Sequence, residues 1–227
     1  MSEVSYDKHT PVTAHDGLAA AVYGEVFTGA SSILNVAGGN TDLQRSLHNH
    51  GIQAAVTAVD PAYARPEYQG KERFVAGYAQ RLEFADESFD MTMCQFGIQH
   101  IPDSDIPAAI NEMVRVTKPA ETPNDCSKGL ILINPVFNFR KMSKALAEAN
   151  ISDNDVFVWH HSDDERLIPK DRRSLLPTLV IHKTTDTTPE MQTQIAKTTA
   201  ESGALKPMHR SVGEIVSRLV FQGRSRA

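Results

Sequence analysis

Two glycines and a carboxylate have the spacing that a site for a nucleoside-type ligand needs. Gly38 and Gly39 follow the apolar run 32–36, and Asp60 ends the next apolar run, 21 residues beyond Gly39. A glycine turn lets a ligand approach the backbone, and a helix after it directs N–H groups and its positive dipole end there. A carboxylate at Asp60 can accept hydrogen bonds from both hydroxyls of a ribose. The pattern therefore indicates a site for an adenosine-containing cofactor.

This pattern alone does not distinguish nicotinamide dinucleotides from S-adenosylmethionine. The dinucleotide fingerprint Gly-x-Gly-x-x-Gly is absent, and nothing replaces its third glycine. A nicotinamide-dependent oxidoreductase is therefore the least favoured of the readings considered below.

The elements that must position these residues alternate along the chain. Apolar runs that predict strands lie at 32–36, 54–59, 73–76, 89–96, 129–135, 156–159 and 178–181. Helical patterns lie at about 13–28, 41–50 and 137–150, and Asp105 is expected to cap a further helix. This alternation predicts an α/β fold of the Rossmann-like, doubly wound kind, with a mostly parallel seven-stranded sheet and helices on both faces. The last two strands lack a clear helix between them, which predicts an antiparallel pair at one edge.

The chain divides into a domain at 1–185, with a cap helix at about 13–28, and a C-terminal helical extension at 186–227. In the extension, apolar residues from Val212 to Val220 form one helical face. This stripe must be buried, either on the domain's own surface or in a homodimer contact.

The composition of the chain argues against some classes of binding partner and location. The formal net charge is −5, which argues against a general nucleic-acid binder because phosphate contacts need a basic surface. The sequence has no apolar run near the roughly 20 residues of a membrane-spanning helix and no signal-peptide pattern. Only two cysteines occur, so a cytoplasmic location is expected.

Two longer segments are more discriminating than the glycine turn. Residues 77–90 resemble the family segment Gly-Asp-Ala-x-x-Leu-Pro-Phe-x-Asp-x-Ser-Phe-Asp, and residues 112–119 resemble Glu-x-x-Arg-Val-Leu-Lys-Pro. Both lie in the expected order around the glycine turn and Asp60. The chain thus resembles class I S-adenosylmethionine-dependent methyltransferases over roughly residues 30–136.

The resemblance implies a role for individual positions. Residues 35–40 would wrap the methionine part of S-adenosylmethionine, Asp60 would hold the ribose, and the end of the fourth strand would flank the sulfonium. The cofactor-binding set that follows is Asn35, Ala37, Gly38, Gly39, Asp60, Pro61, Tyr78, Ala79, Gln80, Gln95 and Phe96. Pro61 would line the adenine, and residues 78–80 would lie beside its ring.

The chain departs from the family pattern at four of these or adjacent positions. Asn35 replaces the usual acid, Ala37 and Thr41 stand where glycine is usual, and Tyr78 replaces an aspartate. These departures leave a second hypothesis open. The chain could be a degenerate methyltransferase fold that serves as a non-catalytic binding or regulatory module.

Other reactive side chains have simpler interpretations. His100 follows the fourth strand and is the one candidate general base. The alternative for this histidine is a purely structural role. Cys94 lies inside a strand, so a packing role is expected. Glu112 and Arg115 can pair with each other or with the sheet, and an architectural role is expected for both. The pair His48 and His50, and the adjacent pair His160 and His161, lack a matching ligand cluster, so no metal is expected. We expect a methyltransferase that acts on a small-molecule acceptor.

Overall fold

The apolar runs of the sequence form the strands of one sheet in the computed structural model, which describes residues 27–39, 42–121, 127–136, 138–149, 151, 155–159 and 178–185. Its strands are β1 (Ser32–Val36), β2 (Ala55–Val59), β3 (Phe74–Val75), β4 (Met91–Gln95), β5 (Leu130–Asn134), β6 (Asp155–Trp159) and β7 (Thr178–His182). Each lies within or one residue beyond the run that predicted it. Continuous hydrophobicity identifies these strands because both faces of the sheet are covered.

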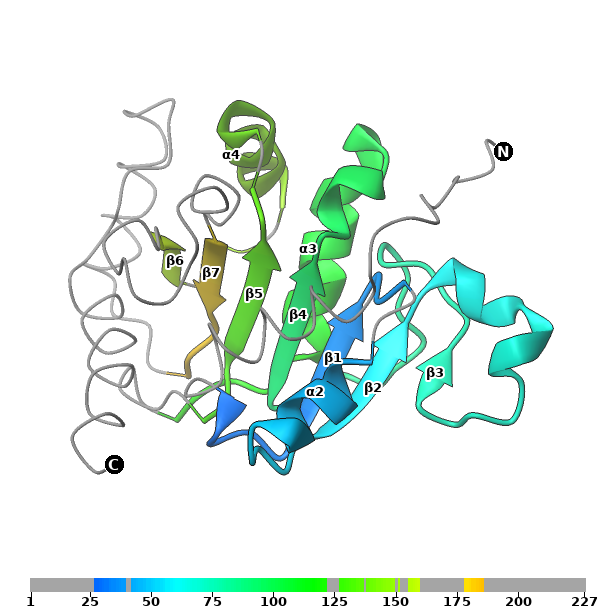
Figure 1. Ribbon diagram of the computed structural model, residues 1–227. Helices are drawn as coiled ribbons and strands as arrows, with labels where there is room; N and C mark the ends of the chain where they lie inside the picture. The colour runs from blue at the N-terminus through cyan, green and yellow to red at the C-terminus, as the bar shows by residue number, and fades with distance from the viewer. Residues whose placement is uncertain are drawn as a thin grey trace, which may run out of the picture.

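The strands lie in the order β3-β2-β1-β4-β5-β7-β6 (Figure 1). The pairs from β3 to β5 are parallel, whereas β5 with β7 and β7 with β6 are antiparallel. The predicted Rossmann-like α/β sheet and its antiparallel pair at one edge are thus confirmed. The order reverses between β1 and β4, and ligands of open α/β sheets bind beyond the strand ends at such a point.

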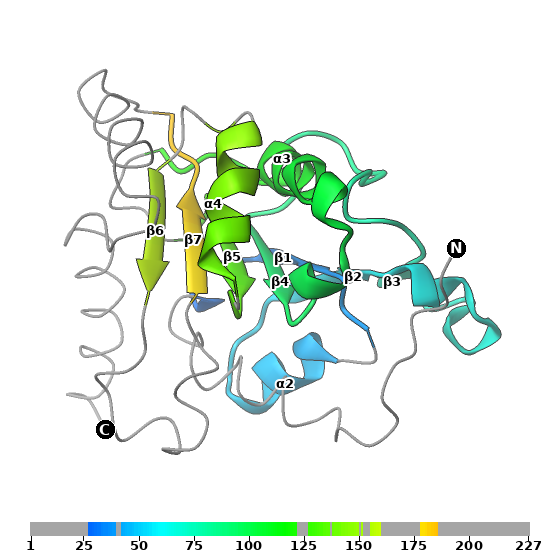
Figure 2. The ribbon, with the colours of Figure 1, turned by 90° about the horizontal axis from the view of Figure 1, so that it is seen from above.

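Helices cover both faces of this sheet. Helix α2 (Leu43–Asn49) lies on one face, and α3 (Ile106–Val116) and α4 (Phe139–Glu148) lie on the other (Figure 2). The buried residues of α3 include Ile106, Ile110 and Met113, which is the stripe that the helical period predicts. They pack in one core with residues of β1, β4, β5, β7 and α4.

Side chains next to the helices explain where two of them begin. The Asp42 carboxylate accepts a hydrogen bond from the Arg45 N–H at the start of α2, and the Asn138 side chain does the same for Lys141 in α4. Asp105 precedes α3 as predicted, but its side chain makes no capping bond. Its carboxylate accepts hydrogen bonds from Gln80 and Ser104 instead, so the expected cap at this helix is wrong.

Several predictions fall outside the described residues. They are the cap helix up to residue 26, the turn positions Asn40 and Thr41, the histidines 160 and 161, and the extension at 186–227 with its apolar stripe. The division into a domain and an extension stays a prediction.

Candidate cofactor site

The turn after β1 is held tightly against β2. Ala37 and Gly39 have positive φ angles of 54° and 56°, so the chain reverses sharply at the end of the strand. The Gly38 N–H donates to the Val59 carbonyl at 3.2 Å. The turn therefore lies at the carboxyl ends of β1 and β2, next to the point where the strand order reverses.

Asp60 connects this turn to the segment after β2. One carboxylate oxygen accepts from the Gly39 N–H at 2.9 Å, and the other accepts from the Ala62 N–H at 2.8 Å. The second bond caps the short 3-10 helix η1 (Pro61–Ala64). Only 2% of Asp60 is exposed, and Pro61 beside it is exposed. Two backbone donors thus orient the carboxylate at the predicted ribose position.

Position 38 has no room for a side chain. A Cβ atom there would lie 2.6 Å from the Tyr63 hydroxyl oxygen and 3.1 Å from the Asn35 amide nitrogen. Both Asn35 and Tyr63 are buried under the turn. Asn35 thus supports the glycine turn from within the sheet, and Tyr63 is a supporting residue that the sequence pattern did not reveal.

The predicted adenine segment, residues 78–80, divides its side chains between surface and core. Tyr78 is 56% exposed, an unusual exposure for a large apolar side chain in the described residues. Ala79 is part of the hydrophobic core, and the Gln80 amide donates to Asp105 at 3.3 Å. Tyr78 is therefore the side chain of this segment most accessible to a flat ring.

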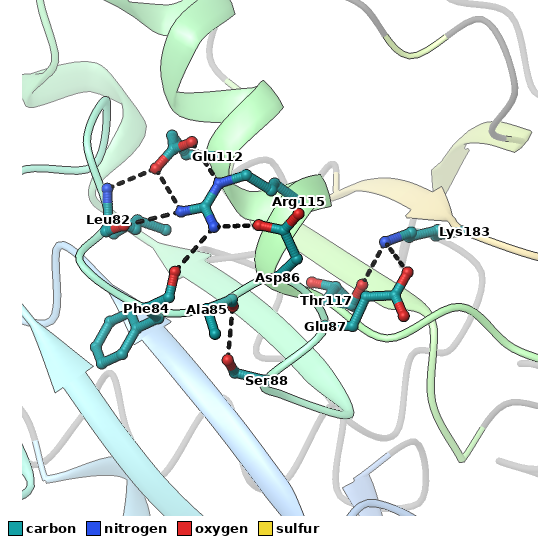
Figure 3. A network of polar contacts seen from close by, with 10 residues as sticks. All are labelled: Leu82, Phe84, Ala85, Asp86, Glu87, Ser88, Glu112, Arg115, Thr117 and Lys183. Carbon is teal, nitrogen blue, oxygen red and sulfur yellow. Dashed lines mark hydrogen bonds and ion pairs between the residues drawn. The ribbon is translucent and has the colours of Figure 1, made fainter.

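Arg115 of α3 anchors the segment that follows (Figure 3). Its guanidinium donates to the carbonyls of Leu82 and Phe84, each at 2.8 Å, and to Asp86 at 2.6 Å. It also forms a two-bond pair with Glu112, whose carboxylate accepts from the Leu82 N–H at 2.7 Å. The hydrogen bond from Arg115 lowers the pKa of Glu112. The predicted architectural role of both residues is confirmed.

Asp42 and Arg73 form a pair that the sequence analysis missed. Two bonds of 2.7 Å join the Arg73 guanidinium to the Asp42 carboxylate, and the guanidinium also stacks on Phe74, 4.5 Å from the ring centre. The hydrogen bond from Arg73 is the main reason why the pKa of Asp42 is lowered. This pair fastens the start of α2, just beyond the glycine turn, to β3.

At the end of β4, the described side chains are polar or partly exposed. Gln95 is partly exposed and lies opposite Asn134 of β5, and Phe96 has a positive φ of 51°. Asn134 is fully buried and donates to the Thr178 hydroxyl at 2.9 Å. His100 is exposed at the end of the short 3-10 helix η3 (Ile98–His100). These residues lie at the carboxyl ends of β4 and β5, which β1 separates from β2 and Asp60 in the strand order.

Cys94 is a packing residue, as predicted. It is fully buried in β4, and burial raises the pKa of its thiol to about 12. Within the described part of the chain, no group of three or more His, Cys, Asp or Glu side chains could hold a metal ion. His48 and His50 are both exposed there. None of the helices in the same residues is long and apolar enough to cross a membrane.

Comparisons with known proteins agree with this geometry. Residues 33–120 match the family model described as "Methyltransferase domain", a range that runs from β1 past α3 and includes the glycine turn, Asp60 and Arg115. The YcgJ protein of Bacillus subtilis has a similar fold, with a TM-score of 0.50 and 15% identity over 76% of this chain and 100% of that chain. This second likeness concerns the fold alone.

Two curated relatives match shorter parts of the chain. A demethylmenaquinone methyltransferase of Streptomyces griseus is 46% identical over 55 residues, which are 22% of this chain and 23% of the relative. A ubiquinone/menaquinone biosynthesis C-methyltransferase of Legionella pneumophila is 38% identical over 99 residues, or 39% of each chain. Both matches therefore cover less than half of the relative's length.

The Rossmann-like sheet carries a glycine turn after β1, an acid after β2 and the Glu112–Arg115 pair before β5. Over residues 33–120 the chain matches a methyltransferase domain. This match confirms the resemblance to class I S-adenosylmethionine-dependent methyltransferases that was expected from the sequence.

Proposed function

We propose that this chain binds S-adenosylmethionine where the strand order reverses and transfers its methyl group to a small-molecule acceptor. The observation that carries the proposal is the Asp60 carboxylate, which Gly39 and Ala62 orient at the end of β2. A carboxylate can accept more than two hydrogen bonds, so the same group can also receive ribose hydroxyls. The family match over residues 33–120 supports this reading.

The residues present suit the parts of this cofactor. The turn at 37–39 brings backbone close to its amino-acid portion, Asp60 receives the ribose, and the exposed Tyr78 ring offers a stacking surface for the adenine. Tyr78 replaces a hydrogen-bonding aspartate, so we propose recognition of the adenine by stacking. Gln95 and Phe96 would then lie beside the reacting methyl group.

The bound sulfonium supplies an activated methyl group, so the protein's main tasks are alignment and exclusion of water. Transfer of this methyl group would leave the acceptor with one proton to lose. His100 is our candidate for receiving that proton, because it is exposed on the segment that follows β4. The names of the relatives make substituted quinols the first acceptors to test.

Calorimetry tests the cofactor part of this proposal. S-adenosylhomocysteine should bind the wild type with a dissociation constant on the order of micromolar, and Asp60→Asn should weaken binding at least about tenfold. Asparagine keeps a capping oxygen for Ala62, which favours a folded variant. The exposed Glu72 provides the matched control, because Glu72→Gln should bind as the wild type does.

The titration also separates the competing functions. Wild-type protein that binds neither S-adenosylmethionine nor S-adenosylhomocysteine would contradict the enzyme proposal and favour a non-catalytic module. Binding of NADH in their place would favour the oxidoreductase reading. If the cofactor binds, methyl transfer to quinols measured by mass spectrometry tests the acceptor class separately.

A further inference from the structure

Gly97 is the second residue after β4, and its backbone does not need a glycine. Its φ and ψ angles are −101° and −37°, in the right-handed helical region that any L-residue adopts. A requirement for glycine at this position must therefore come from the space around it.

That space is filled by the turn of the candidate cofactor site. A Cβ atom at position 97 would lie 2.5 Å from the Ala37 methyl carbon, 2.9 Å from the Cys94 sulfur and 3.4 Å from the Ala37 carbonyl oxygen. Non-bonded carbon atoms are most favourably separated by about 3.5–4.0 Å. The Ala37 methyl thus occupies the place where a side chain of residue 97 would begin.

Ala37 has little freedom to move away. Its positive φ of 54° is a conformation that alanine adopts only under constraint from its surroundings. The next two residues are tied to β2, Gly38 through Val59 and Gly39 through Asp60. The methyl group is therefore held between the turn and the end of β4.

We propose that Gly97 is a positioning residue of the cofactor site and that it acts through Ala37. The absence of a side chain at 97 lets the β4 end approach the turn, so Ala37 and Gly97 together set the distance between the glycine turn and residues 95–100. The family usually has glycine at position 37, and the glycine at 97 makes room for the methyl group that Ala37 adds. The consequence for cofactor binding rests on the proposed function, whereas the coupling between the two residues does not.

A double-mutant cycle tests the pair with two readouts, S-adenosylhomocysteine affinity and the thermal midpoint of unfolding. Gly97→Ala should weaken binding at least about tenfold and lower the midpoint. Adding Ala37→Gly removes the closest contact and should recover most of both losses, although the Cys94 sulfur still limits the space. Recovery of affinity is the result that a contribution to stability alone would not give.

Gly77→Ala is the matched control. Among the described residues, a Cβ atom at 77 would meet only the Val59 side chain, at 3.4 Å, which is an ordinary contact. This variant should bind and melt as the wild type does.

Three results would overturn the proposal. They are unchanged binding and melting of Gly97→Ala, a double variant as impaired as Gly97→Ala, and a double variant that fails to fold along with the single one. If Gly97→Ala fails to fold and the double variant folds, the coupling is supported.

If the wild type and Gly77→Ala bind no S-adenosylhomocysteine, the proposed function fails and the pair is judged by its thermal midpoints alone. If the change in thermal midpoint of the double variant equals the sum of the two single changes, the coupling is overturned. A change that differs from this sum supports it.

Discussion

Individual side chains at the carboxyl edge of the sheet differ in how far burial constrains their chemistry. Asp60 is buried with backbone donors on both oxygens, whereas Tyr78 and His100 are exposed. A buried group can orient a ligand only within a fixed geometry, while an exposed one can adapt to what binds. We infer that the ribose position is set by the fold and that the acceptor side leaves more freedom.

Cys94 gives a prediction at the scale of one residue. Because burial raises the pKa of its thiol to about 12, little thiolate should form in the native protein at about pH 8. In a Cys126→Ser variant, iodoacetamide should leave Cys94 unmodified in buffer and label it fully in denaturant. Peptide mass spectrometry measures both states. Rapid labelling of the native protein would show that the end of β4 opens readily.

At the scale of elements, the loop between β3 and β4 depends on α3. The Arg115 guanidinium donates to the carbonyls of Leu82 and Phe84 and to the Asp86 carboxylate, and so ties this loop to the helix. Tyr78 lies in the same loop, so we infer that the helix indirectly positions the predicted adenine segment.

Arg115→Lys should destabilise the protein by about 1.5–3 kcal/mol, because lysine keeps the charge but cannot bond two carbonyls and two carboxylates at once. Urea unfolding measures the loss. Asp86→Asn is the contrasting variant. The Asp86 side chain is 74% exposed, and an exposed ion pair contributes about 0–1 kcal/mol. Equal losses in the two variants would show that the carbonyl contacts are unimportant.

The order and kind of these elements could be predicted from the sequence, because strand and helix periods are local properties. The Arg115 motif was recognised, yet its bonds to the backbone of residues 82 and 84 were not, since those residues are 33 and 31 positions away. The Asp42–Arg73 pair and the Ala37–Gly97 contact escaped for the same reason. Each of these contacts depends on how separate elements pack, and the hydrophobic periodicity of the sequence does not predict that packing.

At the scale of the whole molecule, three carboxylates join distant parts of the chain. Asp42 pairs with Arg73, and Glu112 accepts a hydrogen bond from the Leu82 N–H. Asp90 accepts from the backbone N–H groups of Ser31 and Ser32 and from Lys118. Burial opposes ionisation of Asp90, but these hydrogen bonds outweigh it, so its pKa is lowered. The pKa values of Asp42 and Glu112 are lowered too.

A lowered pKa in the folded state means that the unfolded chain binds protons first as the solution is acidified. The stabilisation by these carboxylates should therefore be complete above the unfolded-state values of about 4 and be lost as the pH falls through the folded-state values. We expect the urea midpoint to be nearly constant between about pH 6 and 8 and to fall steeply below about pH 4. The difference between wild type and Asp90→Asn should shrink over the same acidic range. A midpoint that rises on acidification would contradict this account.

The antiparallel pairing of β5 with β7 has a consequence for synthesis on the ribosome. All five residues of β5 are buried, and Asn134 meets its partner Thr178 only 44 positions later. At translation rates of about 5–20 residues per second, that edge waits roughly 2–9 seconds for its neighbour. An unpaired edge of apolar residues is a template for pairing with other chains. We infer that the β5 edge of the nascent protein is open to such pairing after β5 has been made and before β7 has emerged.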